Sequence, residues 1–259
     1  MFEQDEARVL NVSDIDEFAY REVAPAPALR RFVECLWSAG RAEPADEADR
    51  RILPDGRMDL IWIRGAGVLI AGPQSRFTMR SRTAPLVAVG ARFWPGAAPG
   101  LLRLPAADFV DGHVALDSVD SRLAGRLERR LEAARSLEQA FDAYNTELLR
   151  YSEQLADLDA AVGEATLMLN DPQTRVADVA SQVFVSERQL RRRFAERVGY
   201  GPKTLQRVLR LQRLLGLLAS EEDLARIAVA AGYADQAHLT RECRELTGFT
   251  PAELARRRR

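Results

Sequence analysis

The sequence predicts an α+β protein in three consecutive parts: a β-rich, barrel- or sandwich-like domain over residues 1–116, a helical connector over residues 117–156, and an all-α domain of two helix-turn-helix units over residues 157–259. Three observations support this fold class. Short apolar runs after Arg50 are separated by turns every 8 to 12 residues or so, which is typical of strands. Apolar residues recur at helical spacing after Asp117, and helix-capping patterns repeat from Ser186 onward.

The length and composition are sufficient for ordinary hydrophobic cores that need no disulfide bonds or metal sites. Of 259 residues, 47% are hydrophobic, and the two cysteines, Cys35 and Cys243, exclude a disulfide framework and a four-cysteine zinc site. Two histidines, His113 and His238, are too few for a metal site built on several histidines. We therefore expect no metal, no cofactor and no catalytic residues, and so no enzyme. The sequence has no apolar run of about 18 residues and starts with acidic residues, which predicts a cytoplasmic protein without membrane contact.

The N-terminal part is expected to alternate strands and turns. Residues 1–28 are acidic and then interrupted by proline, so we expect an arm with little fixed structure. Residues 29–39 predict a turn or short helix followed by a strand, and residues 41–49 a charged loop. Regular β structure is expected from Arg50.

Pro54-Asp55-Gly56 predicts the first hairpin, because proline presets φ and glycine accepts a positive φ. The hairpin would join residues 51–53 to residues 57–63, and residues 64–67 form the next predicted turn. Further strands are expected at residues 68–71, 76–81 and 85–93.

Two amphipathic helices are predicted in the connector. Leu123, Leu127 and Leu131 form one apolar stripe, and the capping box of Ser136 and Gln139 opens a second helix. The apolar positions of that second helix are Phe141, Tyr144, Leu148 and Leu149. Two interpretations stay open: these helices pack on the β domain, or they contact a second copy of the chain.

The first helix-turn-helix unit is expected after a helix that Asp157 caps and that ends near Pro172. A helix with Val176, Val179, Ala180 and Val183 on its apolar face follows. Ser186 and Gln189 then form a capping box, so the second helix of the unit begins at Glu187. Its buried stripe is Leu190, Phe194 and Val198, and a separate face carries Arg188, Arg191 and Arg192.

The second unit repeats this arrangement. Ser220 and Asp223 begin a helix with Leu224, Ile227, Ala228 and Ala231 inside. Asp235 caps the next helix, whose inner stripe is Leu239, Cys243 and Leu246. Its outward positions are Ala237, His238, Arg241 and Arg244, with Gln236 at the tip. Thr250, Pro251 and Glu253 announce a final helix.

The charge is distributed unevenly along the chain. The net charge is −1, but residues 161–259 hold 17 Lys and Arg against 12 Asp and Glu, a net +5, and residues 1–160 hold 20 against 26, a net −6. The positive part is the one with the paired helices, which favours binding to nucleic acid. Arginine dominates both halves, so its abundance also fits a codon bias.

Residues 157–259 resemble the DNA-binding domain of the AraC/XylS transcriptional regulators. The matching residues are Ser186, Leu190, Arg192, Phe194, Gly199-Tyr200-Gly201-Pro202, Arg210, Leu217-Leu218, Ile227-Ala228, Ala231-Gly232-Tyr233, Leu239-Thr240-Arg241 and Leu246-Thr247-Gly248-Phe249-Thr250-Pro251. Two helix-turn-helix motifs at this spacing are highly specific. Residues 53–56, 72–74 and 90–97 also resemble the N-terminal domain of one branch of the family.

The chain departs from the family pattern at four positions. Phe184 takes a turn position usually held by glycine, where a positive φ costs a bulky residue about 1 kcal/mol. Leu205 and Leu254 stand where an aromatic residue is frequent, and Cys243 replaces a usual phenylalanine.

The resemblance implies a regulator that binds duplex DNA and responds to a small-molecule effector. RNA polymerase and a second copy of the chain are further partners to consider. Base contacts are expected from Arg188, Arg191, Arg192, Gln236, His238 and Arg241, and phosphate contacts from Lys203, Thr240 and residues 256–259. The candidate effector contacts are Trp37, Arg57, Asp59, Trp62, Arg92 and Trp94, of which the aromatic residues are alternatively core.

Two other functions remain open from the sequence. The protein is an effector-independent DNA-binding regulator if its N-terminal half only oligomerises. It is a DNA-repair alkyltransferase fusion if Cys35 accepts alkyl groups, although the apolar neighbours of Cys35 favour a buried, inert thiol.

Overall fold

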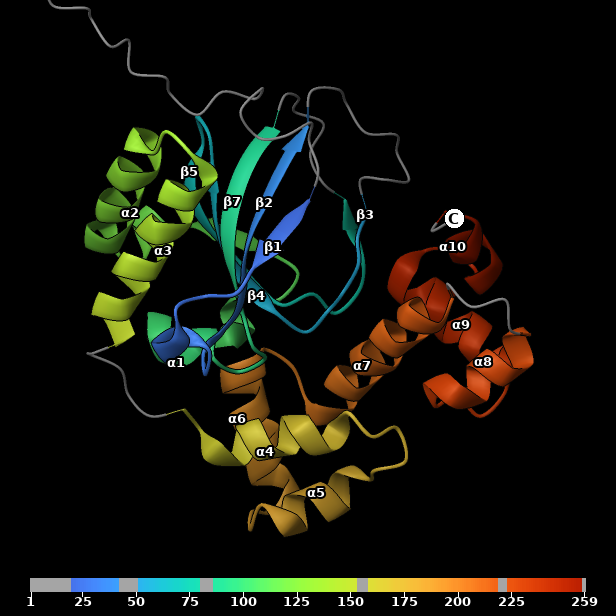
Figure 1. The fold of residues 1–259 in the computed structure, drawn as a ribbon. Coiled ribbons are helices and arrows are strands. Elements are labelled where there is room, and N and C mark those ends of the chain that lie inside the picture. The colour runs from blue at the N-terminus through green and yellow to red at the C-terminus, as the bar shows by residue number, and fades with distance from the viewer. Residues whose placement is uncertain (1–19, 42–50, 80–85, 153–157, 219–222, 258–259) are drawn as a thin grey trace, which may run out of the picture.

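The N-terminal half of the protein is built on an antiparallel sheet, and the C-terminal half is helical (Figure 1). The computed structural model describes residues 20–41, 51–79, 86–152, 158–218 and 223–257. In this part of the chain the main sheet has the order β1-β2-β7-β4-β5-β8, and β3 pairs with β6 in a separate ribbon. The predicted α+β class, with β structure first and helices after it, is confirmed.

The strands differ in length, from two residues in β3 and β6 to nine in β2. The β4–β5 hairpin pairs Ile63 with Gly67, so the predicted turn at residues 64–67 is confirmed. The strands are β1 (Arg21–Val23), β2 (Val33–Arg41), β3 (Arg51–Ile52), β4 (Met58–Ile63), β5 (Gly67–Ala71), β6 (Thr78–Met79), β7 (Leu86–Phe93) and β8 (His113–Ala115). Between them lie the 3₁₀ turns η3 (Pro27–Leu29) and η5 (Ala106–Phe109) and helix α1 (Ala98–Leu102), and the 3₁₀ turn η6 (Leu116–Ser118) follows β8.

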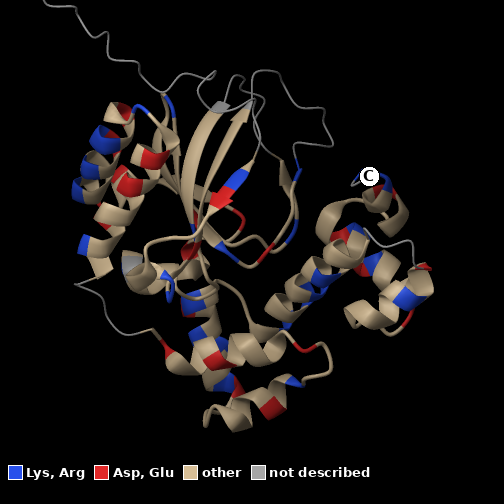
Figure 2. Ribbon diagram, in the orientation of Figure 1, with Lys and Arg blue, Asp and Glu red and all other residues tan. Residues whose placement is uncertain are grey.

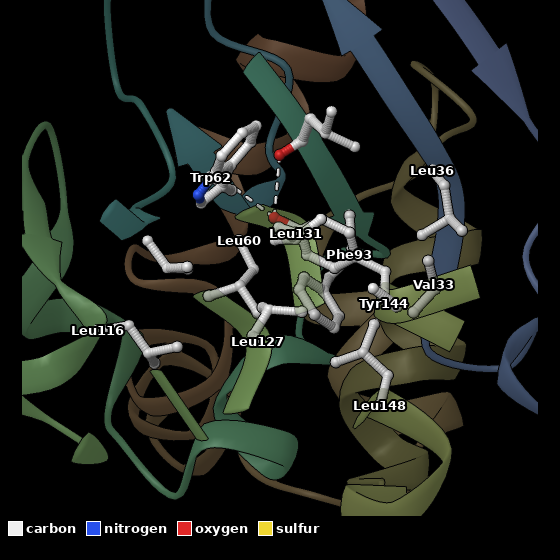
Figure 3. Close-up of a cluster of buried hydrophobic side chains, with 14 of the residues drawn as sticks. Val33, Leu36, Leu60, Trp62, Phe93, Leu116, Leu127, Leu131, Tyr144 and Leu148 are labelled. Atoms are coloured by element: carbon white, nitrogen blue, oxygen red, sulfur yellow. Dashed lines mark hydrogen bonds between the residues drawn. The ribbon is translucent and has the colours of Figure 1, made fainter. Parts of the chain in front are cut away.

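Helices α2 (Ser121–Ala133) and α3 (Leu137–Ser152) cover one face of the sheet (Figures 1 and 3). The stripe of Leu123, Leu127 and Leu131 is buried in the same core as the strands. The Tyr144 hydroxyl accepts a hydrogen bond from Trp62 N at 2.9 Å and donates one to Val89 O at 2.9 Å, as Figure 3 shows. The apolar stripes of both helices therefore pack against the sheet of the same chain.

Three expectations for the N-terminal half are wrong. Residues 21–23 form β1 on the edge of the sheet instead of continuing an arm, because their backbone pairs with β2. Regular β structure consequently begins before Arg50. Residues 51–52 pair with β6 and not with β4, so the predicted hairpin around Pro54 does not form. Residues 1–19 of the arm and the loop at 42–50 lie outside the described residues.

The C-terminal half has two helical cores that share helix α7 (Pro202–Leu217). Leu205 and Val208 belong to the first core, and Leu211 and Leu214 to the second. The other helices are α4 (Ala160–Leu169), α5 (Val176–Gln182), α6 (Glu187–Val198), α8 (Leu224–Ala231), α9 (Gln236–Thr247) and α10 (Pro251–Arg257). Because one rigid helix supplies both cores, the two helix-turn-helix units are held in a fixed relation.

Two predicted caps need correction. Asp159, and not Asp157, caps α4 by accepting a hydrogen bond from Val162 N. Residue 157 lies outside the described part of the chain, as does Ser220. Asp223 occupies the cap position of α8, but its side chain makes no capping hydrogen bond.

Candidate nucleic-acid interface and effector hollow

Helix α6 presents an arginine face to solvent. The predicted capping box is present, with Ser186 Oγ accepting from Gln189 N at 3.2 Å and Gln189 Oε1 accepting from Ser186 N at 2.9 Å. Leu190, Phe194 and Val198 are buried, which turns the opposite side of the helix outward. The arginines on that exposed side are Arg188, Arg191 and Arg192.

Each of two α6 arginines has an acidic neighbour one turn away. Arg191 Nη2 lies 2.8 Å from Glu187 Oε2, and Arg192 Nε lies 3.9 Å from Glu196 Oε1. Both pairs are exposed to solvent, where an ion pair contributes little to stability. These arginines can therefore exchange their carboxylate partners for another anion or a base edge at small cost.

The turn before α6 contains the predicted strained residue. Phe184 has φ of 56° and its side chain is 95% exposed. A left-handed conformation is unfavourable for a residue with a Cβ, so the turn is held by its surroundings. Val185 N donates to Ala180 O at 3.0 Å, which ties this turn to α5.

Helix α9 is the corresponding helix of the second unit. Asp235 caps it by accepting from His238 N at 2.6 Å, as the sequence predicts. Leu239, Cys243 and Leu246 are buried. The exposed positions of its outer side are Gln236, Ala237, Arg241 and Arg244.

His238 and Thr240 are half-buried, unlike these exposed residues and unlike Lys203. The His238 ring packs edge-on against Tyr233 with 5.3 Å between centroids, and its Nδ1 accepts from Ala234 N at 3.3 Å. The Thr240 hydroxyl donates to Gln236 O at 2.8 Å within the helix. Lys203 is exposed in the first turn of α7. His238 thus supports the turn, while Lys203 faces solvent.

A buried carboxylate, absent from our sequence predictions, fixes α9 on α7. Glu242 is 6% exposed and accepts from Arg207 Nε at 3.0 Å and from Arg210 Nη2 at 3.1 Å. Arg207 also reaches Glu245 at 2.5 Å. Removing one partner of such a buried pair leaves the other charge uncompensated, which is strongly destabilising. The sequence signal for this contact is an acidic residue, Glu242, next to the buried stripe of α9, together with two arginines three residues apart on α7.

Blue segments mark Lys and Arg along α6, α7 and α9 in Figure 2. Not all of these charges are available to a partner, because Arg207 and Arg210 are committed to Glu242. Arg213 likewise donates to the carbonyl oxygens of Asn170 and Ala231, which joins α7 to the ends of α4 and α8. The arginines therefore divide into a structural group on α7 and an exposed group on α6 and α9.

The second face of the main sheet carries a hollow of about 420 Å³. Its floor is formed by outward positions of the strands, including Trp37, Asp59, Ile61 and Arg92. The other lining residues are Tyr20, Ala39, Gly40, Ile52, Leu53, Asp55, Arg57, Ala71, Gly72 and Gln74. This volume is in the usual range for small-molecule sites.

Asp59 is the central polar group of the hollow. Its Oδ1 accepts from Trp37 Nε1 at 2.8 Å and lies 3.2 Å from Arg92 Nε. Burial raises the pKa of Asp59 to about 6, although the positive charge of Arg92 acts in the opposite direction. The Trp37 ring can pack closely on the backbone of Gly90 because that residue has no side chain: a Cβ there would come within 2.6 Å of the ring.

The six predicted effector contacts are only partly brought together. Trp37, Arg57, Asp59 and Arg92 line the hollow. Trp62 does not, because alternation along β4 turns it to the helix-covered face, where it is 2% exposed. Trp94 lies outside the lining and donates through Nε1 to Arg30 O at 3.0 Å. The sequence did not single out Tyr20, Asp55 or Gln74.

Residues 51–56, which we call the docking segment, join the hollow to the helical half. Ile52, Leu53 and Asp55 line the hollow. The Leu53 side chain also packs against the core of the second helix-turn-helix unit. The carbonyl oxygen of Pro54 accepts from Gln212 Nε2 of α7 at 2.6 Å.

The start of the docking segment contacts the end of α9. Arg51 Nη1 donates to Thr247 O at 2.8 Å, and the Arg51 guanidinium lies over the Phe77 and Phe249 rings, 4.6 and 3.9 Å from their centroids. Phe77 N donates to Leu246 O at 2.7 Å. These contacts satisfy carbonyl groups that a helix leaves unpaired at its C-terminus.

The end of the docking segment contacts the first unit. Gly56 has φ of 81°, and a Cβ there would come within 2.9 Å of Leu205 Cδ1. Glycine is therefore required both by the backbone and by the close approach to α7. The docking segment thus reaches both units and the helix between them.

Three other expectations concern chemistry or location. Cys35 is buried, and burial raises the pKa of its thiol to about 12, so the reactive thiolate is not formed near neutral pH. Within the described ranges, no group of three or more His, Cys, Asp or Glu side chains could hold a metal ion. None of the described helices has the length and apolar character needed to cross a membrane.

Two family models match separate parts of the chain. The pattern of a family described as a helix-turn-helix domain matches residues 162–257, and that of a domain of unknown function matches residues 21–115. None of the curated proteins matches the chain.

Among solved structures, a transcriptional regulator with an AraC-type DNA-binding domain from Chromobacterium violaceum is 31% identical, with 38% of this chain and 91% of that chain covered and a TM-score of 0.36. The C-terminal domain of AraT, a response regulator from Geobacillus stearothermophilus, is 21% identical, with 39% and 88% covered and a TM-score of 0.37. Unsaturated fatty acid-bound ToxT from Vibrio cholerae is 14% identical, with 90% and 96% covered and a TM-score of 0.46.

Proposed function

Because this chain belongs to the AraC/XylS family of DNA-binding transcriptional regulators, we propose that it reads its operator with α6 and α9 and that a small molecule in the hollow controls this reading. The docking segment supports this proposal most directly, since Ile52, Leu53 and Asp55 line the hollow while other residues of the same segment contact α7 and α9. A ligand that changes the position of this segment changes contacts on α7 and α9 at the same time.

The exposed side chains of α6 and α9 are the proposed base readers. Arg188, Arg191 and Arg192 on α6 and Gln236 and Arg241 on α9 face solvent. Arginine can donate two hydrogen bonds to guanine, and glutamine can pair with adenine, in the major groove. His238, by contrast, is assigned to support of the turn before α9, because its ring and Nδ1 are already engaged.

Phosphate contacts are proposed at the ends of the helices. Lys203 is exposed at the start of α7, and residues 256–257 close α10. Thr240 is a weaker candidate because its hydroxyl proton is used inside α9. Residues 258–259 of the predicted basic tail lie outside the described residues. Such contacts position the protein on the duplex without selecting sequence.

The geometry of α7 suits two successive major grooves. It has 16 residues, which correspond to about 24 Å of helix, and each reading helix adds its own offset from the ends of α7. Successive major grooves on one side of a duplex are roughly 34 Å apart. A single chain would then contact two blocks of sequence one helical turn apart.

The experiment begins with selection of bound duplexes from a random DNA pool, followed by affinity measurements on the enriched operator. Arg192→Ala should weaken operator binding by about 1–3 kcal/mol and relax one position of the site. Arg51→Ala, which removes the contact to Thr247, should change operator affinity by about fivefold or more, because it alters the docking that transmits the signal.

Arg135→Ala is the matched control, since Arg135 is exposed in the connection between α2 and α3. It should leave both the affinity and the site unchanged. If Arg51→Ala also behaves like the wild type, the docking segment transmits nothing, and an effector-independent regulator becomes the better description. An unchanged site with Arg192→Ala would remove that residue from base recognition.

A further inference from the structure

Among the side chains that line the hollow, two carboxylates balance two guanidiniums, but Glu22 and Glu34, which contact the same arginines without lining the hollow, add two negative charges. Its two arginines meet carboxylates on several sides: Arg57 pairs with Glu34, and Arg92 lies 3.2 Å from Asp59, 3.4 Å from Glu22 and 3.8 Å from Asp55. This group of six side chains thus holds four carboxylates and two guanidiniums, a net charge of −2 when all are ionised.

An anionic ligand would find most of the guanidinium donors engaged, although Arg92 Nε, which lies 3.2 Å from Asp59 Oδ1, makes no hydrogen bond to the described residues. Arg57 donates from Nε and Nη2 to the two carboxylate oxygens of Glu34, and from Nη1 to Asp55 O at 2.9 Å. Arg92 Nη1 donates to the Tyr20 hydroxyl at 3.1 Å. An incoming carboxylate or phosphate would have to displace these partners and enter a site that already has excess negative charge.

The acceptors of the hollow, in contrast, have capacity left. Asp59 receives both of its contacts on Oδ1, and a carboxylate offers about four lone-pair positions in all. Gln74 lines the hollow, and its Oε1 is buried without a hydrogen-bond partner among the described residues. A buried acceptor without a donor is unfavourable, so a turn of the Gln74 side chain toward a ligand that donates hydrogen bonds would relieve the cost.

Two aromatic rings form one side of the hollow. Tyr20 and Trp37 have ring centroids 6.1 Å apart and a tilt of 31°. The faces of such rings attract cations, with tryptophan the strongest. Ile52, Leu53 and Ile61 add apolar surface for the body of a ligand.

We propose that the hollow binds an organic cation, with an ammonium or guanidinium group directed to Asp59 and an aromatic or aliphatic body against Trp37 and Ile61. This inference rests on the proposed function, because it names the class of effector for the same hollow. The excess of carboxylates, the free acceptor and the aromatic wall all favour a positive ligand that donates hydrogen bonds.

The titration of Asp59 predicts that binding of a cation depends on pH. Burial raises its pKa to about 6, and a cation beside it would favour the ionised form. Binding should therefore strengthen as pH rises through this value and release protons near it. The charged and titratable groups around Asp59 are Tyr20, Glu22, Glu34, Cys35, Asp55, Arg57 and Arg92.

Tryptamine, tryptophol and indole-3-propionate test this proposal, because they share an indole ring and differ in charge. Calorimetric titration of the full chain without DNA should show that tryptamine binds at least about tenfold more tightly than the other two probes. The preference should weaken by a similar factor below pH 6, where Asp59 is protonated.

Asp59→Asn should abolish the preference for tryptamine, since the amide keeps the shape and loses the charge. Glu132→Gln is the matched control, because it removes one negative charge from an exposed position on α2. A preference that survives in Asp59→Asn, or that disappears in both variants, would overturn the proposal. Equal or tighter binding of tryptophol or indole-3-propionate, or no tryptamine binding up to millimolar concentration, would overturn it too.

Operator affinity then separates this inference from the proposed function. If tryptamine binds as expected and leaves operator affinity unchanged, the ligand class stands and control of DNA binding by the hollow fails. If a neutral or anionic compound changes operator affinity through the docking segment, control stands and the cation proposal fails.

Discussion

The two faces of the main sheet have opposite chemistry although they belong to the same strands. One face packs on α2 and α3 in a large apolar core, with Leu60 and Ile70 at 0% exposure. The other has a small apolar cluster around Cys35 and Trp37 and a hollow with charged side chains. In β4 the burial alternates residue by residue, so the same strand places side chains on both faces of the sheet. We therefore expect most of the stabilising burial on the covered face, which leaves the open face available for a ligand.

The largest effect is expected from Tyr144 on the covered face. Tyr144→Ala should lower the free energy of unfolding by about 3–5 kcal/mol, because it removes a large buried ring and leaves a cavity. Tyr144→Phe should cost about 1–3 kcal/mol, since Trp62 N and Val89 O lose the hydroxyl between them. Denaturant unfolding measures both, and a near-neutral Tyr144→Ala would contradict the assignment of stability to this face.

A smaller effect is expected from Asp59 on the open face. Unlike Tyr144, which stabilises the fold, the ionised Asp59 side chain destabilises it. Its pKa is raised from 3.8 to about 6, so the folded state holds a proton that the unfolded state releases between these values. Stability is then fully present below pH 4 and is lost as pH rises through 6, by up to about 3 kcal/mol from this group.

Asp59→Asn should remove this loss, so unfolding curves of the variant should depend less on pH between 4 and 7 than those of the wild type. Glu132→Gln should leave the wild-type dependence in place, because that carboxylate is exposed. If the free energy of unfolding of wild type and of Asp59→Asn depended on pH in the same way, the pKa of Asp59 would not be raised by burial.

The smallest effect is expected from a matched pair of isoleucines. Ile70→Val, on the covered face, should cost about 0.5–1.5 kcal/mol. Ile61→Val, on the half-buried open face, should stay within about 0.5 kcal/mol. Thermal unfolding of both variants checks the difference, and equal costs would show that packing on the two faces is alike.

Local sequence signals predicted the helical half well. The capping boxes at Ser186 and Thr250, the Asp235 cap and the positive φ of Phe184 are all present in the structure. Each depends on residues within a few positions, so neighbouring side chains decide the outcome. The same locality explains the confirmed turn at residues 64–67.

Predictions that depended on distant partners were less successful. Pro54-Asp55-Gly56 does turn the chain, but whether residues 51–52 pair with β4 or with β6 depends on contacts to α7 and α9, more than 140 residues away. From the sequence, Trp62 and Trp37 are equivalent candidates, because both are aromatic residues of the β domain. The alternation of β4 relative to α3 places them on opposite faces.

The sequence alone determined the α+β order, the paired helix-turn-helix units and the arginine faces of their second helices, because caps, turns and helical periodicity act over a few residues. Tertiary structure decided which face of the sheet is covered, that Asp59 and Arg92 share a hollow, and that residues 51–56 dock on the helical half. Those outcomes depend on burial and on hydrogen bonds between distant segments, which no local pattern specifies.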